Sequence, residues 1–424
     1  RVVILCVWLF SVVAGHAQLS LDECRRLARE NYPEIRQYDL VHQTEQYNLS
    51  NAARAWIPQL AFSAQATWQT DAPNFPKELT GMLAQQGLEI PGLRKDQYKV
   101  ALELNQTIWD GGKSVADKRI ARAEAAEQKT MTDVDLYELE GRVDDLYFGI
   151  LLLDERIAQT NLTLNLLRSN LEKVRALQRN GVAMQSDADV LEAELLSVGQ
   201  QLIQFESSCD SYRRMLGIFI GQKVGDRKLQ HPSAVQPLSG ESARPELAMF
   251  AAKIDRLTAQ EKMVKSSSMP RLGFFAQGYY GYPGLDYMQS MMNNDWSWNA
   301  MLGVKLSWNF GAYYTQKNNL NKLRTSRQQV EVQRDVFLFN MNLQAAQENG
   351  DIARLRKAIA DDDRIVALRR SVREAAESKL RNGIIDTHDL LSKITDESTA
   401  SMARSMREIE LLKAIYEYKH TINR

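Results

Sequence analysis

The stretch NQTIWDGGKS, residues 105–114, has the residue types of a phosphate-binding turn. It ends in Gly112-Lys113-Ser114, as the P-loop of nucleotide-binding enzymes does, where backbone amides and a lysine hold phosphates. A P-loop also requires a glycine at position 107, but Thr107 is there. Its strand should be a continuous apolar run because it is buried, whereas residues 99–108 alternate. The stretch therefore does not predict a nucleotide site, and the glycine pair needs another explanation.

Other residues that could do chemistry are scattered along the chain. The histidines after position 17 lack metal-ligand spacing; they are His42, His231, His388 and His420. Cys24 and Cys209 are far apart, no CxxC occurs, and Cys209 falls in an apolar heptad pattern that predicts a small core residue. The 53 basic and 53 acidic residues give no charge excess that would indicate a nucleic-acid partner. We therefore expect no enzyme activity, no cofactor and no metal.

The first 17 residues resemble a secretory signal. Arg1 precedes an apolar run over residues 2–13, and small residues follow at Gly15 and Ala17. We expect cleavage after Ala17 and no lipid anchor, since Gln18 rather than cysteine would begin the mature chain. No later stretch reaches about 18 apolar residues, so we expect no membrane-spanning helix. An exported chain of this kind is either soluble or a β-barrel.

The rest of the sequence consists of two repeats with the same order of predicted elements. In each half a helical stretch ends at a proline (Pro58 or Pro270), and a strand, a loop and a second strand follow. A long helical segment then runs to an Asn-Gly pair, 180–181 or 382–383, and a final helical segment closes the half. We therefore expect a first repeat over residues 18–221, a connecting segment over 222–242 and a second repeat over 243–424.

Four segments alternate between apolar and polar residues over roughly ten positions, which is typical of tilted transmembrane β-strands. The apolar sets are Leu60, Phe62, Ala64, Ala66, Trp68; Val100, Leu102, Leu104, Ile108; and Trp298, Ala300, Leu302, Val304, Leu306, Trp308, Phe310, with a glycine- and tyrosine-rich segment over 272–282. The tryptophans after position 17 lie in these segments or within four residues of their ends, where interfacial aromatic residues belong. A soluble, half-buried sheet would alternate in the same way.

The helical segments follow heptad spacing, which predicts coiled-coil packing. The seam positions are Leu136, Leu139, Val143, Leu146, Ile150, Leu153, Ile157, Thr160, Leu164, Leu167, Leu171, Val174; and Leu191, Leu195, Val198, Leu202, Phe205, Cys209, Tyr212, Leu216, Phe219. A helix over residues 112–178 would be about 100 Å long, and the Asn-Gly pairs would end such helices with a left-handed residue. Four strands cannot close a barrel, and an open sheet edge is unsatisfied in lipid, so several copies must share one barrel.

The motifs resemble the TolC-like outer-membrane efflux protein family. They are LSLDEC over 19–24, NYPE over 31–34, the joints at Pro58 and Pro270, WDGG over 109–112 and the two Arg-Asn-Gly turns. The resemblance implies an α+β membrane protein of the bacterial outer membrane, a homotrimer in which each protomer gives four strands to a twelve-stranded β-barrel. Long helices would continue as a coiled-coil α-barrel in the periplasm. It implies an exit duct for efflux or type I secretion that docks on a periplasmic adaptor and an inner-membrane transporter and does no chemistry.

The resemblance also implies site residues. An acid six residues beyond each turn glycine, Asp187 and Asp389, would line a periplasmic constriction, although both also suit helix capping. The tip turns Asn180-Gly181 and Asn382-Gly383 are candidate docking points for the adaptor. The family's second gating acid and its arginine are not reproduced in the second half, where Ser392 and Ile385 stand.

The glycine pair is then explained as a strand-to-helix junction. The junction positions are Pro58, Trp109, Gly111, Gly112, Pro270, Trp308 and Gly311. We expect Ile108 to face lipid, Asn105 and Thr107 to face water, and Lys113 and Ser114 to open the helix on its hydrated side. Residues 71–97 and 284–297 would be external loops. The alternative reading is a periplasmic coiled-coil adaptor or scaffold that forms no channel, and the transported substrate stays open.

Overall fold

The computed structural model describes residues 18–87, 90–233 and 242–423. The expected signal peptide, residues 1–17, and part of the expected connecting segment therefore lie outside the described residues. The chain forms two compact units. The sheet unit comprises Asp39–Gln128 and Phe250–Val332, and the helical unit comprises Arg1–Tyr38, Lys129–Met249 and Gln333–Arg424.

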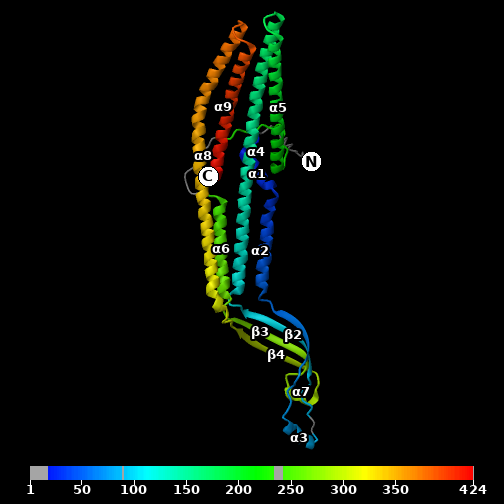
Figure 1. Ribbon diagram of the computed structural model, residues 1–424. Coiled ribbons are helices and arrows are strands. Elements are labelled where there is room, and N and C mark those ends of the chain that lie inside the picture. Colours follow the sequence, from blue (N-terminus) through cyan, green and yellow to red (C-terminus); the bar gives the residue numbers. More distant parts are fainter. Residues whose placement is uncertain (1–17, 88–89, 234–241, 424) are drawn as a thin grey trace, which may run out of the picture. The chain divides into compact units, whose positions relative to one another are not determined.

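The sheet unit contains one antiparallel sheet of four strands in the order β1-β2-β3-β4 (Figure 1). The strands are β1 (Gln59–Trp68), β2 (Asp96–Trp109), β3 (Arg271–Tyr282) and β4 (Ser297–Ser307). Helices α2 (Gln37–Arg54) and α6 (Pro245–Ser266) precede β1 and β3. Short helices α3 (Lys77–Gln85) and α7 (Tyr287–Asn293) lie between the strands of each pair, and α7 was not expected. Both strand pairs thus occur where the alternating segments predict them.

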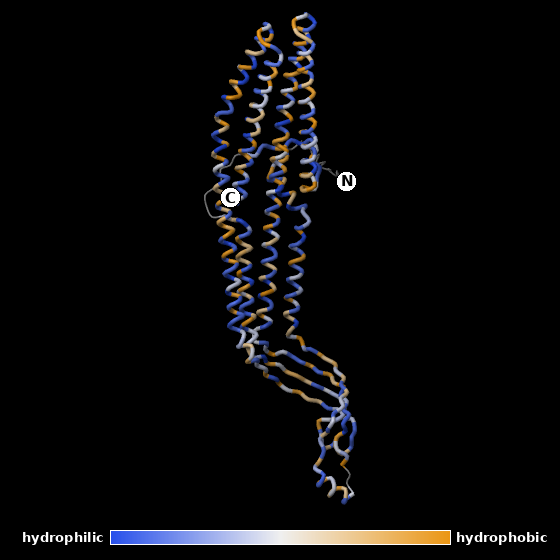
Figure 2. The backbone as a smooth tube through the Cα atoms, viewed as in Figure 1, coloured by the Kyte–Doolittle hydropathy of each residue, from blue (hydrophilic) through white to orange (hydrophobic). Residues whose placement is uncertain are grey.

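The strand register aligns residues of one kind across the sheet. One row is apolar throughout: Leu60, Leu104, Ala276 and Leu302. The next row, with side chains on the opposite face, has polar residues on the two central strands: it consists of Ala61, Glu103, Gln277 and Met301. Figure 2 shows hydrophobic and hydrophilic residues interleaved along the strands. Because successive side chains point to opposite faces, the sheet has one apolar face and one polar face.

The pairing of β2 with β3 shifts register between Thr107 and Trp109. Such a bulge increases the local twist at the end of a strand. Gln106, just before it, falls in register with Phe274 among apolar residues. Its amide Nε2 donates to the carbonyl oxygen of Trp56 at 2.5 Å, which satisfies a polar group on the apolar side.

Two helices continue through both units: α4 (Lys113–Arg179) and α8 (Ala312–Arg381). The helical unit also contains α1 (Leu21–Asn31), the 3₁₀ turn η1 (Pro33–Arg36), α5 (Gln185–Ile220) and α9 (Thr387–Ile422). None of the helices within the described residues carries an apolar stretch long enough to cross a membrane. The long helix expected over residues 112–178 is α4.

The heptad seam is buried almost as expected. Leu136 to Ile150 belong to one apolar cluster with Cys209 and Leu216, and Leu164 to Val174 belong to a second with Leu191 and Val198. The exception is Tyr212, which is 39% exposed. Its ring lies over Gly149, where a Cβ atom would stand 2.5 Å from it. The ring therefore rests on a helix surface without a side chain rather than inside the seam.

The start of the described chain is fixed to the helical unit by polar contacts. Leu19 forms an isolated parallel bridge with Leu229. The buried Tyr147 hydroxyl lies 2.8 Å from the Leu19 carbonyl oxygen and 2.6 Å from that of Gln230. Burial raises the pKa of Tyr147, so the hydroxyl stays protonated and can donate. One tyrosine of α4 thus holds two segments that are distant in sequence.

Candidate functional site

The first strand-to-helix junction is organised by Asp110, which follows β2. Its carboxylate accepts hydrogen bonds from the backbone N–H of Gly112 at 2.9 Å and of Ser114 at 2.6 Å, and from the Ser114 hydroxyl. Although burial favours the protonated acid, these hydrogen bonds lower the pKa of Asp110. The residue caps the N-terminus of α4, which is how free amides at a helix start are usually satisfied. Ser114 is 3% exposed, so the expectation that it opens the helix on its hydrated side is wrong.

Gly111 and Gly112 both have left-handed backbone angles, φ +70° and +85°. A Cβ atom on Gly111 would lie 2.7 Å from Cβ of Met269, whereas one on Gly112 would meet nothing within 4 Å. Glycine is thus needed at position 111 for two reasons. Its backbone angle is left-handed, and the chain leading into β3 lies too close to leave room for a side chain. At Gly111 the first junction therefore packs against the second junction, at Met269-Pro270.

The second junction uses different residues. The indole Nε1 of Trp308 donates to the Ser268 carbonyl oxygen at 3.0 Å, and the Trp308 ring lies against Phe310 with centroids 4.7 Å apart. Gln316 of α8 donates to the Ser268 hydroxyl at 2.8 Å. The predicted positions Trp109 and Trp308 are 44% and 47% exposed. Half-exposed tryptophans with one apolar side are typical of the border between lipid and water.

The two predicted tip turns have the same hydrogen bonds. Gly181 and Gly383 have φ of +73° and +67°. The following residues donate to the carbonyl five positions earlier, Val182 to Leu177 at 2.9 Å and Ile384 to Lys379 at 3.0 Å. This is the Schellman arrangement, which ends a helix at a left-handed glycine.

Apolar side chains follow both turns at the same position. Val182 is 66% exposed and Ile384 is 69% exposed. Each helical hairpin therefore presents one exposed, β-branched residue directly after its turn glycine. Exposed apolar residues on turns are candidates for contact with another protein.

The structure distinguishes the two predicted constriction acids. The Asp187 carboxylate accepts from the Met184 backbone N–H at 2.8 Å and so caps its own helix, α5. In α9 that role belongs to Asp386, which accepts from the Asp389 N–H at 2.8 Å. The Asp389 side chain is exposed and, among the described residues, has no hydrogen bond or ion pair. Nothing in the described chain joins Asp187 to Asp389, so the constriction stays a prediction.

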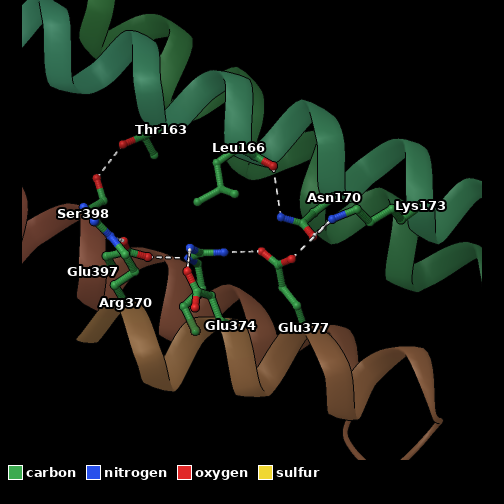
Figure 3. Close-up of polar contacts among 10 residues, drawn as sticks. Thr163, Leu166, Asn170, Lys173, Arg370, Glu374, Glu377, Glu397 and Ser398 are labelled. Atoms are coloured by element: carbon green, nitrogen blue, oxygen red, sulfur yellow. Dashed lines mark hydrogen bonds and ion pairs between the residues drawn. The ribbon is translucent and has the colours of Figure 1, made fainter. Parts of the chain in front are cut away.

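A polar network links α4 to α8 and α9 near these turns (Figure 3). Lys173 of α4 lies 3.3 Å from Glu377 of α8. Thr163 of α4 shares a hydrogen bond of 2.6 Å with Ser398 of α9. Partial burial favours the neutral acid, but Arg373 and Lys173 lower the pKa of Glu377. The network therefore connects the first helical hairpin to the second.

Arg373 is the centre of this network. Its guanidinium contacts Glu397 of α9, which is 9% exposed, and Glu377 one turn further along α8. Arg370 contacts Glu397 as well, at 3.2 Å. Sequence reasoning missed this network because helix packing brings its members together: Arg373 and Glu397 are 24 positions apart, and Lys173 and Glu377 are 204 apart. The only sequence signal is the Arg373–Glu377 spacing, which is common on helices.

Comparison with known proteins relates the first half of the chain to a family. Residues 25–221 match the model of the outer membrane efflux protein family. A search of curated proteins finds no match. Within the described residues, no cluster of histidine, cysteine and acidic side chains could hold a metal ion.

Solved structures with the same fold include three named channels or outer-membrane proteins. The outer-membrane channel OprN matches with a TM-score of 0.70 and 14% identity, over 95% of this chain and 89% of that one. The outer membrane protein VceC from Vibrio cholerae matches with 0.66 and 14%, over 95% and 94%. The Campylobacter jejuni CmeC outer membrane channel matches with 0.65 and 14%, over 95% and 85%. At these identities the matches establish the fold.

Proposed function

We propose that this chain, whose residues 25–221 match the outer membrane efflux protein family, forms the outer-membrane exit duct of a tripartite efflux or type I secretion system. Members of this family are transport channels of the outer membrane that extend into the periplasm. The duct carries substrates passively from an adaptor and an inner-membrane pump, and the chain itself catalyses no reaction. The two repeats, residues 18–221 and 243–424, with residues 222–242 between them, are its proposed building blocks.

The observation that carries the proposal is the sheet with two unlike faces. Side chains as large as Phe62, Trp298 and Leu302 are 72%, 82% and 76% exposed on its apolar face. Covering such a face with lipid removes it from water, at about 25 cal/mol per Å² of apolar surface. The polar face would then line a water-filled lumen.

The proposed assembly is a homotrimer with a twelve-stranded barrel. Within the described chain, β1 and β4 are the ends of the sheet and each pairs on one side only. An unpaired strand edge in lipid leaves several backbone groups without hydrogen bonds, at several kcal/mol each. Pairing of β1 with β4 of the next copy removes both edges.

Cross-linking tests this assembly. Asn299 of β4 would be replaced by cysteine together with Ala61, Ser63 or Gln65 of β1, one pair per variant; all four positions belong to the polar-face set. One of these registers is expected to give disulfide-linked trimers in outer membranes, since a disulfide needs Cβ atoms about 4 Å apart. The native Cys24 and Cys209 are buried and serve as the background control. Monomers in all three registers would contradict the shared barrel.

Fractionation and conductance separate the duct from the alternative, a coiled-coil adaptor or scaffold. A duct is recovered from the outer membrane as a detergent-stable trimer and gives discrete current steps in planar lipid bilayers. An adaptor is recovered in the soluble or inner-membrane fraction and gives no current. Recovery in that fraction without current would refute the proposed function.

The exposed Val182 and Ile384 support docking of a periplasmic adaptor on the turns at Asn180-Gly181 and Asn382-Gly383. Replacing both apolar residues with aspartate should weaken capture of the periplasmic adaptor by about tenfold or more, because the contact would bury charge. Bilayer conductance should be unchanged. Normal capture by the double variant would remove the turns from the docking surface.

A further inference from the structure

A cavity of 570 Å³ opens on the polar face of the sheet, where β2, β3 and β4 meet the start of α4. All of its lining residues belong to the sheet unit. The charged ones are three acids and three bases: Glu103, Asp110, Asp117, Lys113, Arg271 and Lys305. Their formal sum is zero, so the character of the cavity depends on which charges are already engaged.

Each acid of the cavity has a partner within the sheet unit. Asp110 is held by the amides and the hydroxyl at the start of α4. Asp117 accepts from Lys113 at 2.8 Å, one helical turn away. Glu103 accepts from the Gln277 amide, whose oxygen in turn accepts from Lys99 at 3.0 Å. Gln277 thus links Glu103 to Lys99, a cation outside the cavity lining.

Arg271 and Lys305 are different. Both are exposed, and neither side chain has a hydrogen bond, ion pair or ring contact with another described residue. They lie diagonally across β3 and β4, because Arg271 is in register with Ser307 and Lys305 with Gly273. Diagonal neighbours on one face are about 7 Å apart, within reach of long side chains. Gly273 places no side chain opposite Lys305.

The first repeat carries no such pair. Arg271 follows Pro270, and the residue that follows Pro58 is Gln59. In the second repeat, Lys305 is in register with the residue two positions after Arg271, and in the first repeat Glu103 is in register with the residue two positions after Gln59. The second repeat thus has two cations where the first has a neutral amide and an acid. Glutamine, which is polar and uncharged, is a suitable test substitution at both positions.

We propose that Arg271 and Lys305 form a transient binding site for the anionic group of molecules passing through the duct: a carboxylate, sulfate or phosphate. Arginine binds such groups with two parallel hydrogen bonds, and lysine adds a point charge. Lumen rings of arginine and lysine favour anions, and exposure of the pair keeps binding weak enough for release. This inference rests on the proposed function, because only a barrel places the polar face on a lumen.

The test measures block of potassium current by inorganic pyrophosphate in bilayers of neutral phosphatidylcholine. The double variant R271Q/K305Q is expected to raise the half-blocking concentration by about fivefold or more, because two attractive charges are lost. Its reversal potential in a salt gradient should move toward cation selectivity. The charge-conserving variant R271K/K305R should keep both properties, which separates charge from any effect on folding.

Lys77→Gln, which removes one cation from α3 outside this cavity, is the control and should leave block and selectivity at wild-type values. Equal block of wild type and R271Q/K305Q, with normal conductance in both, would overturn the site and leave the duct intact. If R271Q/K305Q loses block only in bilayers that contain anionic lipid, the pair binds lipid phosphate instead. That result would also overturn the proposed site. Absence of any current from the wild-type trimer would instead remove the proposed function.

Discussion

Arg25 of α1 binds Asp144 of α4 through two parallel hydrogen bonds, with Nε of the guanidinium 2.7 Å from Oδ1 of the carboxylate. Asp144 is 7% exposed. Burial raises the pKa of this acid more strongly than Arg25 lowers it. The pair joins α1 to the apolar cluster of α4, which contains Cys24 and Tyr147.

Arg25→Ala is expected to destabilise the helical unit by about 3–5 kcal/mol, because it leaves a buried carboxylate without its partner. Arg26→Ala is the matched control. Arg26 forms an exposed pair with Glu30 at 2.9 Å, and exposed pairs contribute about 0–1 kcal/mol. Thermal unfolding of the detergent-solubilised protein, followed by circular dichroism, measures both. Equal losses for the two variants would show that the buried pair has no special role.

His420 near the end of α9 predicts a pH dependence of stability. Its ring stacks on Tyr137 with centroids 4.2 Å apart. Burial, with a smaller effect of Arg244, lowers the pKa of His420 to about 4. The unfolded chain therefore binds this proton more readily than the folded chain does. Neutral His420 therefore contributes up to about 3 kcal/mol to the free energy of unfolding. This contribution is fully present above pH 6.5 and is lost as the pH falls toward 4.

His420→Gln should flatten the stability profile between pH 6.5 and 4, whereas His388→Gln should not, because His388 is exposed beside the turn. Denaturant unfolding at several pH values measures the difference. A wild-type profile that stays level over this range would rule out the buried histidine as its source.

Gly111→Ala and Gly112→Ala separate backbone strain from crowding at the first junction. Both replacements place a side chain at a left-handed angle, which costs about 1–2 kcal/mol. Only Gly111→Ala also forces a Cβ atom to within 2.7 Å of Met269, which adds about 1–3 kcal/mol. The yield of detergent-stable trimer and its melting temperature should fall more for Gly111→Ala. A reversed order would mean that the two junctions do not pack as described.

The two constriction acids should respond differently to replacement. Asp187→Asn weakens a helix cap as well as removing a charge, so we expect a loss of about 0.5–1 kcal/mol in stability. Asp389→Asn removes an exposed, uncapped carboxylate and should leave stability unchanged while reducing cation selectivity. Melting curves and reversal potentials give the two quantities. Unchanged selectivity in the double variant would remove both acids from the constriction.

The strands and the long helices could be predicted because their periods are local. Residues two positions apart share a face of a strand, and residues three or four apart share a face of a helix. The four strands and the seam from Leu136 to Val174 follow from this rule, and the duplication follows from the repeated order of these elements. The rule fails where tertiary contacts determine the position of a side chain. Tyr212 is an example, because its ring lies over Gly149.

By itself, the sequence determined which segments are strands, which are long helices and where a glycine must end or begin them. Tertiary structure alone decided which charges are engaged. Asp110 caps a helix and is not part of a phosphate-binding loop, because the backbone amides of Gly112 and Ser114 donate hydrogen bonds to its carboxylate. Arg271 and Lys305 stayed unpaired because the register sets Gly273 and Ser307 opposite them. An ion pair depends on distance in space, and that distance is set only when strands far apart in the chain align.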